Sequence, residues 1–177
     1  VINPNIRTVE PREMWEKYGF EALITNSYVI WKHEQLKESA LSDGVHALLD
    51  YPGVIMTDSG TFQNYVYGDV EVGVEEIVKF QREIGVDIAT MLDVFGTPDM
   101  TEEEIEHAVA ETISRSSVSL DAAGDTMLNG PIQGGIFPEL RKQSAQGMGA
   151  HGFAIHPIGG IVPLMERQRY RELVEII

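Results

Sequence analysis

Short apolar runs alternate with amphipathic segments along this chain, and turn-forming residues separate them. Short apolar runs that are rich in β-branched side chains are typical of buried strands. The fourth such run contains Pro131, which lacks an amide N–H and belongs at an edge or an irregularity of a sheet. We predict five strands, over residues 22–25, 53–57, 86–92, 129–133 and 152–156.

The segments between these runs carry helical periodicity. Residues 75–84 place four apolar side chains on one stripe, and Gly85 follows as a C-cap. Thr101 and Glu104 have the spacing of a capping box, after which an apolar face continues to Ile113. Two further helices are predicted over residues 139–146 and 165–177.

Alternating helices and continuously apolar strands imply an α/β fold with a parallel sheet. Doubly wound sheets and closed barrels both satisfy this pattern. Polar or glycine-rich residues follow four of the strands directly, and in a TIM barrel the carboxyl ends of the strands converge on one site. A Rossmann fold needs a glycine-rich turn after the first strand, and the sequence has none there. We therefore predict a TIM (β/α)8 barrel that is incomplete, with residues 1–177 as a single partial domain.

The composition is that of an average globular protein, with 43% apolar and 23% charged residues. Cysteine is absent, which excludes disulfides, thiolate metal sites and a cysteine nucleophile within these residues. The chain has no membrane-length apolar run and no signal pattern, so we expect a soluble, cytoplasmic protein with no membrane contact. It has no initiator Met and ends in an apolar helical stretch, so we expect a piece of a longer protein.

The net charge of −15 argues against a general nucleic-acid surface, because such surfaces neutralise phosphates with Lys and Arg. A small-molecule site is favoured on charge alone. Much of the acid lies in one run, residues 102–106, so the negative field is local and leaves other faces free. The charge therefore weakens a nucleic-acid role without excluding it.

Two aspartates follow predicted strands and are candidate catalytic groups. Asp58 ends the second strand, where it is either a turn-forming residue or a base or nucleophile at the mouth of a site. Asp93 ends the third strand, where a solvated loop residue is an equally good interpretation. Carboxylates that share one site push their pKa values apart, which is how enzymes divide acid from base roles.

Other candidates lie at the same predicted edge. The amide of Gln133 can donate and accept, as reading a purine edge requires, and Gly159 and Gly160 allow close approach of a ligand to the backbone. Phe62 could stack on a planar ligand or lie in the core. The histidines have no metal-ligand spacing, and His156 has no evident catalytic partner.

At these residues the chain resembles the archaeal tRNA-guanine transglycosylase family. The resemblance runs through most of the chain in five ordered blocks, and the last looks more archaeal than bacterial. The blocks are TDSGTFQ (57–63), FQREIGVDIA (80–89), LD (92–93), GPIQGG (130–135) and HPIGGIVPLME (156–166).

The resemblance implies a TIM-barrel catalytic domain that exchanges guanine in tRNA for 7-cyano-7-deazaguanine, the step that begins archaeosine formation. By motif, Asp58 would be the catalytic aspartate, as nucleophile or as general acid/base. Phe62 would stack on the base, and Asp93 and Gln133 would bind its edge. Backbone groups of Gly159, Gly160 and Ile161 would line the pocket.

The chain lacks parts that the family has. The second catalytic aspartate, the one assigned as attacking ribose C1′, would lie beyond the last strand seen here. The zinc site, made of three cysteines and a histidine, would also lie downstream, so we expect zinc in the full-length protein and no cofactor in this chain. The tRNA-binding domains are absent as well. We therefore expect that this chain alone cannot complete the exchange.

Two other functions stay open. The chain could be a catalytically incomplete subunit that binds a deazaguanine and completes its barrel with a second chain or as a homo-oligomer, since missing strands leave apolar edges. It could also be an unrelated barrel enzyme that acts on an anionic or sugar substrate.

Overall fold

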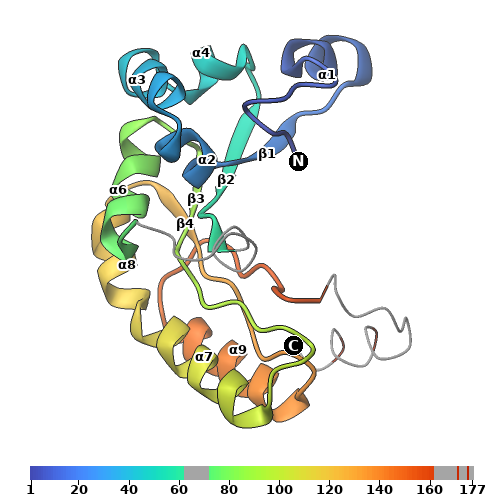
Figure 1. Cartoon of the computed structure of the whole chain (residues 1–177), viewed down its shortest axis with the longest axis vertical. Helices are drawn as coiled ribbons and strands as arrows, with labels where there is room; N and C mark the ends of the chain where they lie inside the picture. Colours follow the sequence, from blue (N-terminus) through green and yellow to red (C-terminus); the bar gives the residue numbers. More distant parts are fainter. Residues whose placement is uncertain (62–71, 162–170, 172–174, 176–177) are drawn as a thin grey trace.

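A computed structural model of the chain describes residues 1–61, 72–161, 171 and 175 (Figure 1). At its centre is a parallel sheet of four strands in the order β1-β2-β3-β4. Each strand pairs with the next one along the chain, so within the described residues the sheet grows in one direction. The strands are β1 (Ala22–Asn26), β2 (Val54–Asp58), β3 (Ile88–Thr90) and β4 (Met127–Asn129).

This sheet confirms the prediction of a parallel α/β fold. β1 and β2 lie within one residue of their predicted bounds, and β3 is shorter than predicted. The sequential strand order is compatible with part of a barrel, because a doubly wound sheet reverses its order at a switch point.

The fourth and fifth strand predictions need correction. β4 ends at Asn129, where the predicted strand 129–133 begins. Asn129 and, beyond the strand, Ile132 form isolated parallel bridges with Ile155 and Ile158, so residues 152–156 form no continuous strand either. Pro131 cannot donate to a ladder, so a continuous strand does not form there.

Three predicted helices are confirmed. Thr101 and Glu104 form the predicted capping box: the Thr101 N–H donates to the Glu104 carboxylate at 2.8 Å, and the Glu104 N–H donates to Thr101 Oγ1 at 3.3 Å. Gly85 follows the first helix with a φ of 72°, the left-handed conformation that favours glycine. The predicted helix 165–177 lies almost entirely outside the described residues. The confirmed helices are α6 (Val74–Glu83), α7 (Glu102–Ser114) and α9 (Pro138–Gly149).

The described residues form five further helices that the sequence pattern does not predict. They have five to ten residues each, too few for a long periodic stripe. These five helices are α1 (Pro11–Tyr18), α2 (Ser27–Lys32), α3 (Glu34–Asp43), α4 (Val45–Leu49) and α8 (Ser116–Ala123).

Among all the helices of residues 1–61 and 72–161, none combines the length and the apolar character that a membrane crossing requires.

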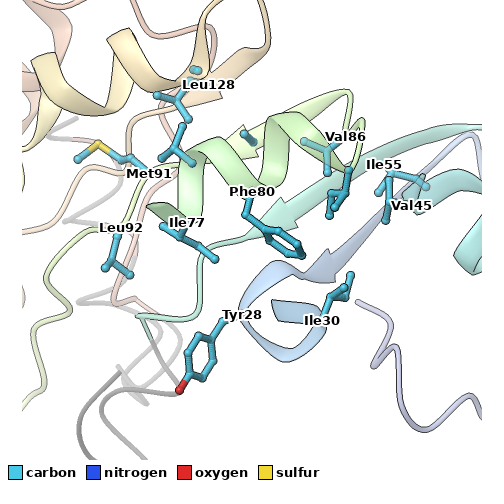
Figure 2. Packing of buried hydrophobic residues seen from close by; sticks show 14 of the residues in the cluster. Tyr28, Ile30, Val45, Ile55, Ile77, Phe80, Val86, Met91, Leu92 and Leu128 are labelled. Atoms are coloured by element: carbon cyan, nitrogen blue, oxygen red, sulfur yellow. The ribbon is translucent and has the colours of Figure 1, made fainter. Parts of the chain in front are cut away.

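The hydrophobic core lies between the sheet and the helices α2, α6 and α8, which run along one side of it (Figure 1). Figure 2 shows Phe80 projecting from α6 toward the side where Ile30 of α2 and Ile55 of β2 lie. Alternate strand positions supply the sheet side of this core, as the two-residue period of a strand requires. The buried apolar strand residues are Leu23, Ile55, Ala89 and Leu128.

The opposite face of the sheet is also apolar and is only partly covered. The strand register aligns one row across all four strands: Ile24, Met56, Ile88 and Met127. Met127 is 50% exposed, and a cavity of about 480 Å³ borders this face.

Candidate active site

Asp58 lies at the carboxyl end of β2, where the chain turns. The Gly60 N–H donates to Asp58 Oδ1 at 3.3 Å, and Ser27 Oγ donates to the Asp58 carbonyl at 2.8 Å. Gly60 has a φ of 95°, and a Cβ on it would lie 2.3 Å from Cβ of Tyr28. The turn therefore requires glycine at position 60. Asp58 helps to form this turn, as one interpretation of the sequence predicts, and it also lies at the strand end, as the other requires.

Asp93 lies three residues beyond β3 and is 8% exposed. Gln133 Nε2 donates to Asp93 Oδ2, and Thr61 Oγ1 donates to the Asp93 carbonyl at 3.2 Å. The solvated-loop interpretation of Asp93 is therefore wrong, because the carboxylate is buried and bonded to the next predicted site residue.

Both carboxyls have raised pKa values, mainly because burial disfavours their charged forms. The negative charge of Asp93 raises the pKa of Asp58 further, and the Gly60 N–H opposes the rise. Hydrogen bonds from Thr61 and Gln133 partly offset the effect of burial on the pKa of Asp93. Two interacting carboxyls with raised pKa values are suited to holding and transferring a proton.

Gln133 lies against the glycine pair. A Cβ on Gly159 would lie 2.3 Å from Gln133 Nε2, and a Cβ on Gly160 would lie 3.0 Å from Gln133 Oε1. The side chain of Gln133 is buried, and its Oε1 has no hydrogen-bond partner among the described residues. An amide oxygen left in this position can accept from a bound donor.

The remaining predicted residues are placed differently. Ile161 follows the glycine pair as the last residue described in that stretch, and it is half-buried. Phe62 lies outside the described residues. His156, for which the sequence offers no partner, places Nδ1 2.9 Å from the Gly130 carbonyl.

A cavity of about 460 Å³ opens beside Asp93, a volume within the usual range of small-molecule pockets. Thr61 and Arg115 contribute polar groups to its wall. The Arg115 guanidinium also lowers the pKa of Asp93, against the larger effect of burial. The pocket can thus hold a polar ligand against the buried carboxylate.

Sequence reasoning missed Gln81, which fixes the two strand ends that carry the aspartates. Its Oε1 accepts from Thr57 Oγ1 at 2.8 Å and from the Thr90 N–H at 2.9 Å, and its Nε2 donates to the Thr90 carbonyl at 2.9 Å. The signal in the sequence is its position: Gln81 follows Ile77 by one helical turn and therefore lies on the buried face of α6.

The zinc site implied by the resemblance does not fit the residues of this chain. Its ligands would be three cysteines and a histidine, and the sequence has no cysteine. Over residues 1–61 and 72–161, no group of three or more His, Asp or Glu side chains is arranged to hold a metal ion.

The sequence is similar to known proteins over its full length. Residues 1–177 match the family described as queuine tRNA-ribosyltransferase. The tRNA-guanine(15) transglycosylase of Thermoplasma acidophilum is 50% identical over 177 residues, covering 100% of this chain and 28% of that protein. The proteins of the same name from Methanosarcina acetivorans and Methanopyrus kandleri are 47% and 43% identical, with 36% and 38% of their lengths covered.

This chain therefore spans about a third of the length of these relatives. The family match covers every block on which the resemblance rests, including the residues around Asp58, Asp93 and Gln133. The chain belongs to the queuine tRNA-ribosyltransferase family.

Proposed function

We propose that this chain is part of the catalytic domain of a tRNA-guanine transglycosylase, one that replaces guanine in tRNA with 7-cyano-7-deazaguanine in archaeosine formation. The observation that carries the proposal is the buried contact between Gln133 and Asp93 beside Asp58, at one edge of the sheet. The names of the archaeal relatives support the reaction and the tRNA substrate.

The domain is proposed to be a TIM barrel of which these strands are one part. The sequential parallel strand order and the apolar face opposite α6 support this arrangement. In a closed barrel that face is the interior, filled by side chains of all eight strands. Strands outside this chain would cover Met56 and Met127.

The base would be recognised at the edge formed by Asp93 and Gln133. An ionised Asp93 can accept hydrogen bonds from the ring N–H and exocyclic amine of a guanine-like base. Gln133 Oε1 can accept from a further donor on the base, and the absence of side chains at Gly159 and Gly160 lets the Gln133 amide lie against their backbone. Phe62 is proposed to stack on the ring, as the resemblance implies.

The exchange is proposed to run in two displacements at ribose C1′. An aspartate outside this chain attacks C1′, the C1′–N9 bond of guanine breaks, and N9 takes the bond's electron pair and a proton. The incoming base then attacks C1′ through its own ring nitrogen, loses a proton and releases the aspartate. Asp58 is proposed to hold and transfer these protons, since burial raises its pKa toward the working range of a general acid/base.

Zinc, tRNA-binding domains and a cytoplasmic location are proposed for the whole protein on the resemblance alone. In the proposed reaction this chain's residues supply the base pocket and the Asp58 carboxyl.

The test is incorporation of labelled guanine into tRNA by the whole protein. Asp58→Asn should reduce kcat by a factor of about 10² or more, the usual value of a proton-transferring group.

Asp93→Asn should raise KM for the free base, because a neutral amide cannot accept from two donors as a carboxylate does. Asp99→Asn, an exposed loop residue, is the matched control. A wild-type protein without guanine incorporation would refute the proposal.

A further inference from the structure

A buried cation lies beside Gln133 and the glycine pair. Arg141 on α9 is fully buried. No carboxylate lies within ion-pair distance of it among the described residues, although seven other ion pairs are present there. Burial lowers the pKa of Arg141 to about 10, so the guanidinium stays charged at neutral pH. A buried charge is costly unless its donors are satisfied, which makes the partners of this side chain informative.

Those partners are backbone carbonyls of two segments, one around Gln133 and one at the glycine pair. Nε and Nη2 donate to the Gly135 carbonyl at 3.0 and 2.9 Å. Nη1 donates to the Gly159 carbonyl at 2.7 Å and to the Ile132 carbonyl at 3.2 Å. Ile132 and Gly135 flank Gln133, so one guanidinium fastens the Gln133 segment to the glycine pair.

The conformation of the loop at Gly134 lets the Arg141 side chain reach these carbonyls. Gly134 has a φ of 134°, and a Cβ on it would lie 2.6 Å from the backbone nitrogen of Arg141. The backbone of α9 therefore packs directly on the loop, with no side chain between them. The Gln133 N–H also donates to Ser144 Oγ at 3.0 Å, which ties the same loop to the next turn of α9.

The bond to Gly159 fixes the direction of a peptide group. The carbonyl of Gly159 points toward Arg141, and the described peptide bonds are all trans. In a trans peptide the C=O and the following N–H point in opposite directions. The Gly160 N–H therefore points away from Arg141, and a Cβ on Gly160 would lie only 3.0 Å from Gln133 Oε1.

We infer that Arg141 is a positioning residue for recognition of the free base, an inference that rests on the proposed function. Its planar fork of donors holds the Gly159–Gly160 peptide so that the Gly160 N–H faces an acceptor on a planar heterocycle. It holds the Gln133 amide beside that N–H, where Oε1 accepts from a donor on the same edge. The pocket thereby selects a base with an acceptor next to a donor.

Arg141→Lys in the whole protein tests this role, because a lysine keeps the charge but offers one ammonium in place of a planar fork. KM for free guanine should rise about tenfold or more, whereas KM for tRNA and kcat at saturating guanine should change less than about twofold, since only ground-state binding of the base is weakened. The matched control is Arg82→Lys. Arg82 on α6 also donates to a backbone carbonyl, that of Ala122 at 2.9 Å. Ala122 lies on α8 and not in the glycine pair. Its kinetics should match those of the wild type.

Each other outcome counts against the inference. An unchanged KM for guanine would show that the fork does not position the pocket. An equal loss in kcat and in both KM values, or a variant that does not fold by circular dichroism, would assign Arg141 to the scaffold alone. A wild-type protein that neither binds guanine nor incorporates it would refute the proposed function itself, and this inference with it.

Discussion

The two aspartates at the strand ends are costly to ionise where the fold places them. Asp93 is buried and Asp58 is half-buried, and each carries a raised pKa. Only part of this cost is offset, by the N–H of Gly60 for one carboxyl and by the amide of Gln133 for the other. Groups that are held in such environments are typical of active sites.

The cost at Asp58 can be measured as a function of pH. Its native pKa is raised above the ordinary 3.8, so the stabilisation from holding its proton is complete below pH 3.8 and is lost as pH rises through the native value. Asp58→Asn cannot ionise and avoids that loss. Its thermal midpoint should exceed that of the wild type by a few degrees at pH 7, and the difference should shrink toward pH 4. Asp125→Asn, at an exposed position, should show neither effect. A variant that is less stable at pH 7, or a gain independent of pH, would contradict this prediction.

At this scale the sequence predicts some site residues and not others. Asp58, Asp93 and Gln133 follow apolar runs, and parallel strands bring such positions to one edge, so their meeting could be foreseen. Gln81 and Arg141 bind mainly main-chain groups outside their own helices, and no spacing rule relates them to those partners.

Helices α6 and α9 each hold two segments of the candidate site together. Each inserts one long polar side chain into the core, Gln81 from α6 and Arg141 from α9. Gln81 ties β2 to β3 just before the chain reaches the aspartates, and Arg141 ties the segment around Gln133 to the glycine pair. The strands themselves are short, so these side chains do part of the alignment that longer ladders do elsewhere.

Replacing Gln81 tests its contribution to the link between β2 and β3. Gln81→Leu keeps the volume but leaves the Thr90 N–H and carbonyl and the Thr57 hydroxyl without this partner in a buried position. We expect a loss of about 2–5 kcal/mol in the free energy of unfolding, since each unsatisfied buried group costs about 1–3 kcal/mol and some will find new partners. Urea denaturation of the whole protein measures it. Gln143→Leu on the exposed side of α9 should cost less than about 0.5 kcal/mol. A similar loss in both variants would assign no special role to Gln81.

The elements that could be predicted are those with a strong local signal. A capping box and an apolar stripe define α7, and β-branched runs define β1 and β2. The sequence misplaces β4 because its three residues, Met-Leu-Asn, include no β-branched side chain, whereas the stretch after it contains Ile132, which forms only an isolated bridge with Ile158. The short helices α2 and α8 are fixed by packing on the sheet, which no local pattern encodes.

At the scale of the whole molecule, the sheet presents two apolar faces and helices cover one of them. The opposite face carries the aligned row of Ile24, Met56, Ile88 and Met127, and the cavity beside it is lined mostly by apolar side chains. An apolar face of this extent is covered in a stable protein, by its own chain or by a partner. The barrel proposed above would cover it with strands that lie outside these residues.

Val54 and Val118 provide a matched test of that covering. They are 40% and 39% exposed, Val54 at the start of β2 on the uncovered face and Val118 on the outer side of α8. If a closed barrel covers the sheet, Val54→Lys in the whole protein places an unpaired ammonium in a core and should cost about 3 kcal/mol or more of unfolding free energy. Val118→Lys should cost less than about 0.5 kcal/mol, because a lysine is accommodated on an exposed helix surface. Chemical denaturation of both variants decides: equal, small losses would mean that this face of the sheet stays open to water and that the strands do not close into a barrel.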